Sequence, residues 1–191
     1  MTTLAESTKS LTILVPTNEV EATGAELAPR PGSLTGLRLG VLDNGKPNSD
    51  RFLELLGGHL ATGYGVEVST VLRKPAIGRL APSEIVAELK SASDIILTGV
   101  GDCAGCCSCT IADAIALEQL GLPVAAVCTS EFATAAALAA ASAGIPGYDV
   151  AVLPHPFGSC TDAVLAESAS SVVERIVTLL TTGSTSELAR R

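Results

Sequence analysis

The sequence predicts an α/β protein, with an open, doubly wound parallel sheet of about five strands in a flavodoxin-like or Rossmann-like three-layer sandwich. Three observations favour this fold. Short aliphatic runs alternate with longer segments of helical periodicity, which is the pattern of βα units. About five such units follow one another, too few for a barrel. The chain has 191 residues, enough for one domain to bury its own core.

The strands are assigned from β-branched and aliphatic runs that end at Gly, Asp, Pro or Thr. They are expected at residues 37–42, 66–72, 94–99, 124–128 and 150–153. The third run contains no charged residue after its first position, so we expect it to be buried on both faces, as central parallel strands are.

The helices are assigned from apolar residues at helical spacing that follow a capping residue. In the first, the stripe consists of Phe52, Leu55, Leu56, His59 and Leu60. Asn48 or Ser49 is expected to cap this first helix, and Pro82 or Ser83 to open the second. The other expected helices span 111–120, with Thr110 as N-cap, 131–143 and 162–180. The Ala-rich helix 131–143 has two interpretations, close helix packing or the face of a homodimer.

The domain organisation follows from composition. Residues 1–35 are rich in Pro, Gly, Ser and Thr around one apolar segment, 11–15, which predicts an irregular arm. Residues 36–182 carry the single α/β domain, and 183–191 form a tail. The 12 Lys and Arg against 20 Asp and Glu, a net charge of -8, argue against nucleic acid. No apolar run reaches the ~18 residues of a membrane span, and no secretory signal is recognised, so we expect a cytoplasmic protein.

Ligands of such sheets bind outside the carboxyl ends of the strands, where polar residues converge from distant parts of the chain. This rule selects the candidate site. His155, held between two prolines, is a candidate proton donor, and Cys160 is a candidate additional thiol. The candidate substrate-binding residues are Asp43, Asn44, Lys46, Asn48, Asp102, Thr129 and Ser130.

Four cysteines, Cys103, Cys106, Cys107 and Cys109, lie within seven positions after the third predicted strand. They contain two overlapping C-x-x-C spacings. Two cysteines at this spacing, on a turn that enters a helix, bring their sulfurs close enough for a disulfide, and the free N–H groups of the helix favour the thiolate. The cluster therefore predicts a redox dithiol in the loop before the helix 111–120.

Two alternatives stay open. Thiolates of Cys103, Cys106, Cys107 and Cys109 can together hold zinc or an iron–sulfur cluster, although such sites normally add a second cysteine pair or histidines. The segment 107–109 also resembles the end of the Cys-x-x-Cys-Ser-Cys metal claw of nitrile hydratases, except that residue 104 is alanine. In the second alternative, the cysteines are small residues packed in the core.

Several segments resemble the UGSC-motif family of selenoproteins and their cysteine homologues. They are VLDNGKPN (41–48), GVGDC (99–103), DA (113–114) with LE (117–118), CTSEF (128–132) and PHPFG (154–158). The resemblance extends from about residue 29 to 158 and implies a Rossmann-like fold. In that family a selenocysteine or cysteine, Gly, Ser and Cys follow an Asp. The resemblance therefore places Cys103 at the selenocysteine position and Cys106 as its partner, with Ala104 and Gly105 as departures.

The family resemblance implies selenol or thiol redox chemistry. Interchange of selenium and sulfur makes sense where nucleophilicity matters, which favours Cys103 as the attacking residue. The spacing of Cys103, Cys106 and Cys109 is similar, more faintly, to the selenocysteine subunits of glycine and proline reductases. We therefore expect Cys103 to attack a small-molecule substrate and Cys106 to resolve the adduct, with an external thiol or thiol reductant protein and no further cofactor. The alternative hypothesis is a metal-thiolate protein with a hydratase, lyase or sensing role.

Overall fold

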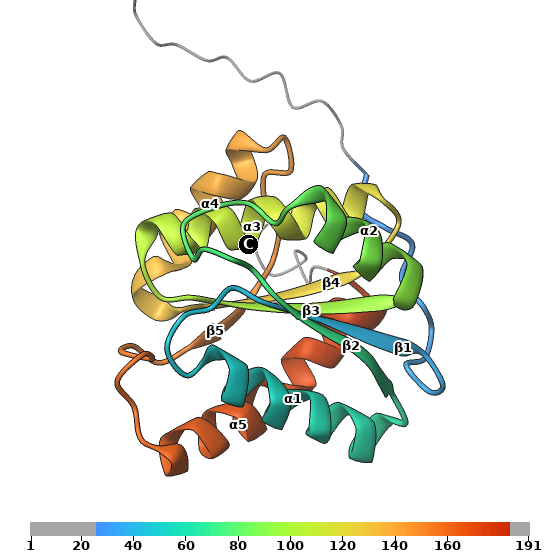
Figure 1. Cartoon of the computed structure of the whole chain (residues 1–191), viewed down its shortest axis with the longest axis horizontal. Coiled ribbons are helices and arrows are strands. Elements are labelled where there is room, and N and C mark those ends of the chain that lie inside the picture. Colours follow the sequence, from blue (N-terminus) through green and yellow to red (C-terminus); the bar gives the residue numbers. More distant parts are fainter. Residues whose placement is uncertain (1–25, 184–191) are drawn as a thin grey trace, which may run out of the picture.

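The computed structural model describes residues 26–183 and confirms the predicted α/β sandwich (Figure 1). All strands pair in parallel, in the order β2-β1-β3-β4-β5, which is the flavodoxin-like order. The elements are β1 (Arg38–Asp43), α1 (Ser49–Tyr64), β2 (Glu67–Arg73), α2 (Ser83–Ala92), β3 (Ile95–Gly101), α3 (Ala104–Gln119), β4 (Val124–Thr129), a 3-10 turn (Ser130–Phe132), α4 (Ala133–Ser142), β5 (Ala151–Leu153) and α5 (Asp162–Thr181).

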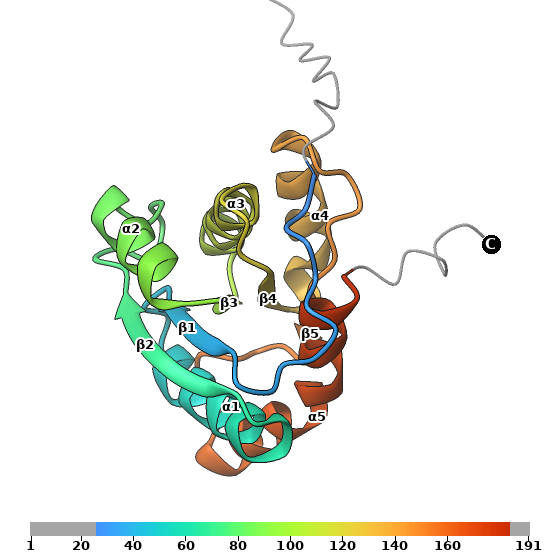
Figure 2. The ribbon, with the colours of Figure 1, turned by 90° about the vertical axis from the view of Figure 1, so that its right-hand side faces the viewer.

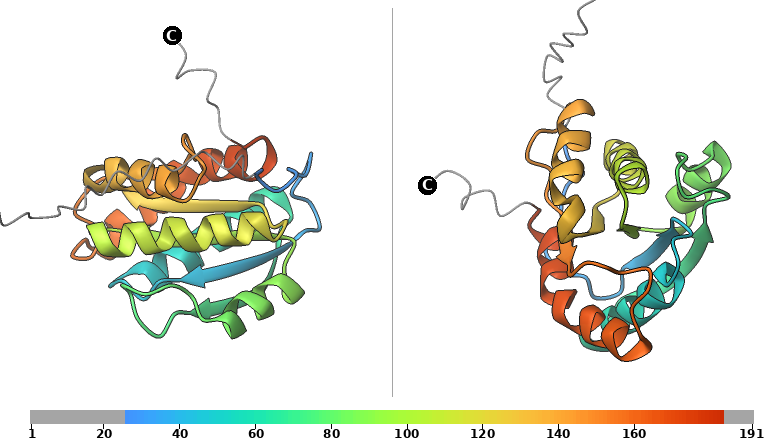
Figure 3. Two further views of the ribbon diagram at one scale, coloured as in Figure 1. Left: turned by 90° about the horizontal axis from the view of Figure 1, so that it is seen from above. Right: turned by 90° about the vertical axis from the view of Figure 1, so that its left-hand side faces the viewer.

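Helices cover both faces of the sheet. Helices α1 and α5 pack together on one face, and α2, α3 and α4 lie on the other (Figures 1 and 3). The central strands β3 and β4 are buried at every position, which explains their uninterrupted apolar sequence. Each face has its own apolar cluster, one that includes Phe52 and Ile176 and one that includes Ile111 and Leu117. Within residues 26–183 no helix is both long and apolar enough to cross a membrane.

Helix α3 begins seven residues earlier than predicted, at Ala104. Its N-cap is Cys103, whose Sγ accepts a hydrogen bond from the backbone N–H of Cys106 at 3.3 Å. Thr110, the predicted N-cap, is instead buried inside the helix. The prediction was wrong because a thiol sulfur here accepts the N-capping hydrogen bond that side-chain oxygens usually accept. The cysteine cluster consequently lies on the first two turns of a helix and not in a loop.

Two smaller expectations about helices also change. In α1 the buried stripe is rotated toward Leu53 and Gly57, so His59 is exposed and Leu55 is 39% exposed. Gly57 lies on the buried side of the helix, facing Leu39 and Val68 on the strands. The predicted helix 131–143 is divided into the 3-10 turn and a shorter α4.

Helix α3 also fastens two irregular segments through buried ion pairs. Glu118 pairs with Arg30 at 2.7 Å and accepts a hydrogen bond from the N–H of Ala28 at 2.9 Å. Asp113 pairs with Lys74 at 2.5 Å and accepts one from the N–H of Ala81 at 2.8 Å. The described part of the predicted arm, residues 26–35, therefore lies against the domain, while 1–25 and 184–191 are outside the described residues.

The Glu118 interaction leads to a stability prediction. We expect Glu118→Ala to lower the free energy of unfolding by about 3–5 kcal/mol, because it leaves the Arg30 charge buried without its partner. Urea unfolding followed by circular dichroism measures the change. The control is Glu88→Ala on the exposed face of α2, which we expect to change stability by about 0.5 kcal/mol at most. Equal effects of the two substitutions would contradict the anchoring role.

Candidate functional site

The side chain of Asp102 lies where three strand ends meet. It follows β3 directly and is 8% exposed. Its Oδ1 accepts a hydrogen bond from the Thr129 hydroxyl at the end of β4, at 3.1 Å, and lies 2.9 Å from Nδ1 of His155 after β5. Its Oδ2 accepts one from the N–H of Gly158 at 3.2 Å. The predicted convergence of residues after β3, β4 and β5 is therefore confirmed.

Lys46 brings the loop after β1 to the same point. Its Nζ lies 3.4 Å from Oδ2 of Asp102 and donates to the Asp102 carbonyl oxygen at 3.2 Å. Glycine at position 158 favours the close approach, because a Cβ there would stand 3.3 Å from Cε of Lys46, a tight contact, and 3.5 Å from Oδ2 of Asp102. The terminal glycine of the PHPFG segment thus makes room for this ion pair.

These contacts keep Asp102 ionised. Burial raises the pKa of its carboxyl group, but the Gly158 and Thr129 hydrogen bonds and the charge of Lys46 lower it by more, so the pKa lies below its ordinary value. The ionised Asp102 carboxylate accepts a hydrogen bond from the Nδ1–H group of His155. Nε2 of the half-exposed imidazole is then left to bind other partners. Asp102 therefore orients His155.

The two cysteines of the first C-x-x-C spacing occupy unequal environments. Cys103, at the N-cap of α3, is partly exposed, whereas Cys106 is 1% exposed. The Cys106 thiol donates to the Cys103 carbonyl oxygen at 3.3 Å. Burial, together with the neighbouring Cys103 thiol, raises the pKa of Cys106 to about 12. At neutral pH, Cys106 is a protonated thiol held one helical turn behind Cys103.

The remaining thiols are spread over three surroundings. Cys107 is fully buried, and its thiol donates to the Phe132 carbonyl oxygen at 3.5 Å. A hydrogen bond with Cys128 and burial raise the pKa of Cys107. Cys109 and Cys160 are partly exposed. Between residues 26 and 183, no group of three or more His, Cys, Asp or Glu side chains is placed to hold one metal ion. The four clustered thiols therefore do not converge on a common centre.

Asn48 connects the loop after β1 to the segment after β5. Its backbone has a φ of 70°, in the left-handed region, which Asn adopts more readily than most residues. Its Nδ2 donates to the carbonyl oxygens of Phe157 and Cys160, both at 3.3 Å, and lies 3.9 Å from Sγ of Cys160. Asn48 stands at the N-cap position of α1, as one alternative expected, but its side chain makes no capping bond.

Asp43 and Asn44 are buried and engaged in the scaffold. Asp43 accepts hydrogen bonds from the N–H of Gly45 and the hydroxyl of Ser49, and it pairs with Arg73 at 3.3 Å. Nδ2 of Asn44 donates to the carbonyl oxygen of Val100 at 2.9 Å and to the Thr110 hydroxyl at 3.1 Å. Ser130 is exposed at the start of the 3-10 turn. Within residues 26–183, the hydrogen bonds of Asp43 and Asn44 go to this scaffold and not to Asp102 or Cys103.

A small cavity of about 280 Å³ adjoins His155 and Cys160 on the side of α5. Its other lining residues include Pro154, Phe157 and Val164. The backbone N–H groups of Phe157 and Gly158, which bind Asp102, were not predicted as site groups. The only signal for them in the sequence is the Phe-Gly pair that follows the two prolines, because a backbone donor leaves no residue type to recognise.

The lowered pKa of Asp102 predicts how stability depends on pH. Its contribution is complete above the unfolded-state pKa of about 3.9 and is lost as the pH falls through the lower folded-state value. We expect Asp102→Asn to cost about 2–4 kcal/mol at pH 7, and the difference from the wild type to shrink below about pH 4. Urea unfolding at several pH values measures this. Asp50→Asn, at an exposed position, is the control, and a difference independent of pH would contradict the prediction.

The comparison with known families agrees with the resemblance in the sequence. The model of the UGSC family matches residues 12–182, which is most of the chain and includes every residue of the candidate site. No curated protein matches the chain, so the similarity to reductase subunits stays a prediction. From this match, with the fold and the Asp102 site that it contains, we conclude that the chain belongs to the UGSC family.

Proposed function

We propose that this chain is a thiol-dependent redox enzyme that acts on a small molecule, with Cys103 as nucleophile and Cys106 as resolving thiol. The observation that carries the proposal is the inequality of the two thiols. Cys103 is partly exposed at the N-terminus of α3, whereas Cys106 is buried with a pKa of about 12. An accessible attacking thiol and a protected resolving thiol, one turn apart, form the arrangement that a dithiol cycle needs.

The reaction can be written so that its atoms and electrons balance. The Cys103 thiolate attacks an electrophilic atom X of a substrate X–Y, and Y leaves with the bonding electron pair and takes up a proton. The Cys106 sulfur then attacks Sγ of Cys103, so that X leaves with its electron pair and is protonated. A Cys103–Cys106 disulfide remains, and an external dithiol reduces it. The substrate gains two electrons and the external dithiol loses them.

The neighbouring polar groups support defined roles. His155, oriented by Asp102, is the proton donor for the leaving group. The charge of Lys46 lowers the pKa of Cys106 and so favours its thiolate when the adduct is resolved. The Thr129 hydroxyl donates to the same Asp102 oxygen that lies beside His155 and so helps to hold the carboxylate in place. Asn48 holds the segment that contains Cys160 by a hydrogen bond to its backbone. This segment, in turn, lines the cavity beside His155.

The metal-thiolate alternative has less support. The Cys107 thiol is buried toward Phe132 and Cys128, away from the partly exposed Cys103. In the part of the chain that the structure describes, no three His, Cys, Asp or Glu side chains are placed to hold one ion. Metal analysis of protein purified without chelator decides the matter: the dithiol proposal expects well under one equivalent of zinc, iron or cobalt per chain. A stoichiometric metal would contradict it.

Alkylation of the reduced protein tests the order of reactivity. We expect Cys103 to be labelled first and Cys106 to stay unlabelled below about pH 10, because its raised pKa keeps it protonated. Peptide mapping by mass spectrometry measures each site. Cys160, which is also partly exposed but lies before the N-cap of α5 and not on the first turn of α3, is the internal control. Equal labelling of Cys103, Cys106 and Cys160 at neutral pH would contradict the proposed roles.

Two substitutions separate the roles of the thiols. Cys103→Ser is expected to abolish oxidation of Cys106 by a small disulfide, whereas Cys106→Ser is expected to trap the small thiol on Cys103 as a stable mixed disulfide. Intact-mass measurement distinguishes these products. Cys109→Ser is the matched control on the same helix and is expected to behave as the wild type. Trapping on Cys109 or Cys160 would keep the thiol chemistry and overturn the assignment of Cys103.

A further inference from the structure

The outer edge of the sheet at β2 is uncovered. Among residues 26–183, β2 pairs with β1 alone, so the peptide groups along its other side face outward (Figure 2). Two of its apolar side chains are also exposed, Val68 at 42% and Val71 at 63%. Proteins usually shorten, charge or cover such an edge, because it is a template for pairing with another chain. Here the middle of the edge carries no charged residue.

An irregularity in the strand places both valines on one face. The register between β1 and β2 shifts after Leu39, so Val68 stands beside Leu39 and Val71 beside Val41. Leu39 and Val41 both belong to the apolar cluster on the α1 side. In a regular strand, residues three positions apart point to opposite faces. The shift therefore places the side chains of Val68 and Val71 on the same face of the sheet, next to α1.

Helix α1 leaves this part of the sheet open. The helix packs mainly on α5, β1 and β3, and a groove of about 590 Å³ remains between α1 and β2. Its apolar lining comes from both elements and includes Leu53, Gly57, Val68 and Val71. We call this the α1/β2 groove. It continues the uncovered edge of β2 onto one face of the sheet.

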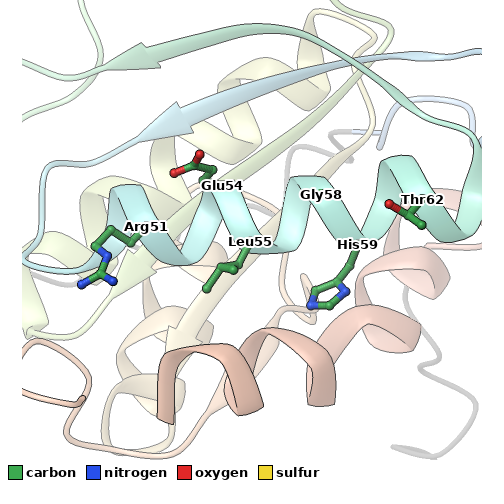
Figure 4. Close-up of a pocket in the computed structure, with 6 residues that line it drawn as sticks. All are labelled: Arg51, Glu54, Leu55, Gly58, His59 and Thr62. Atoms are coloured by element: carbon green, nitrogen blue, oxygen red, sulfur yellow. The ribbon is translucent and has the colours of Figure 1, made fainter. Parts of the chain in front are cut away.

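A second groove lies along α1, but it differs in character. Its lining residues all belong to α1, with Glu54 directed toward the strands and Leu55 and His59 directed toward α5 (Figure 4). Nε2 of His59 lies 3.4 Å from the Ser170 hydroxyl of α5. No strand edge borders this groove, and most of its lining side chains are polar. It offers no surface comparable to the β2 edge.

We propose that the β2 edge and the α1/β2 groove form the interface with a second copy of this chain, in which the two β2 strands pair antiparallel across a two-fold axis. The ends of the strand carry opposite charges, Glu67 at the first residue and Arg73 at the last. Arg73 pairs with Asp43 and Asp50 in its own copy, but 53% of its side chain stays exposed and open to a further carboxylate. A two-fold axis reverses the second strand, so it brings Arg73 of each copy toward Glu67 of the other. With Glu67 opposite Arg73 the axis passes at Thr70, so Val71 of each copy lies opposite Ser69 of the other, and the two Val71 side chains stand diagonally across the axis on one face. The result is one sheet of two parallel halves.

Sedimentation velocity across a wide range of protein concentration tests the proposal. We expect the full chain to dimerise, and Val71→Lys to weaken dimerisation at least about tenfold, because it places two ammonium groups near the axis. Glu67→Lys is expected to weaken it less, and less again at high salt. Both positions are exposed, so circular dichroism should show an intact fold. Leu138→Lys, at a 65% exposed position on α4, is the matched control.

Each other outcome overturns the proposal. A chain that stays monomeric at all concentrations has no such interface. If the full chain is monomeric and a chain without residues 1–25 dimerises, the occupant of the edge is the chain's own N-terminal segment. If Leu138→Lys disrupts the dimer and Val71→Lys does not, the interface is the Ala-rich helix. The alkylation pattern of Cys103 is independent of all these results, so failure here leaves the proposed thiol chemistry intact.

Discussion

The ionised carboxylate of Asp102 is the interaction on which the arrangement of the carboxyl edge depends. Parallel strands bring their ends to one edge, but nothing in the backbone pairing aligns the loops that follow. Asp102 does so, because its two oxygens bind groups from the loops after β1 and β5 and from the last residue of β4. A buried carboxylate tolerates this position only with a full set of donors. The position of His155 and the contact of the segment after β5 with this edge therefore both depend on the negative charge of Asp102.

Helix α3 connects this site to the rest of the domain. Its first turn carries Cys103 and Cys106, its middle carries Asp113, and its last turns carry Glu118. The two acidic residues bind segments at opposite ends of the sheet, at Lys74 and at Arg30. Gly101 allows the helix to start directly after β3, because a Cβ there would stand 3.0 Å from both Cα and Sγ of Cys107. The turn that carries Cys103 and Cys106 thus belongs to a helix that is held at its start, its middle and its end.

The positions of the strands were predicted well from the sequence, because buried parallel strands consist of continuous aliphatic runs. The meeting of the residues at their carboxyl ends followed from those positions. It missed the start of α3, since capping preferences direct attention to Thr110 and away from the thiol of Cys103. The buried pairs of Glu118 with Arg30 and of Asp113 with Lys74 join residues far apart along the chain, and periodicity carries no sign of them. Of the candidate site, Lys46, Asp102, Thr129 and His155 were found by their place after strands. The backbone donors at 157 and 158 could not be.

The sulfur cap of α3 has a consequence for the shape of the protein during a dithiol cycle. In the reduced chain, Sγ of Cys103 accepts the N–H of Cys106 and closes the first turn. A sulfur bonded to a second sulfur or to substrate carries less negative charge and accepts a hydrogen bond less well. The same atom therefore cannot react and cap the helix equally well. If Cys103 reacts as proposed, bond formation at its sulfur would loosen the turn that buries Cys106, and the chemistry itself would expose the thiol that acts next.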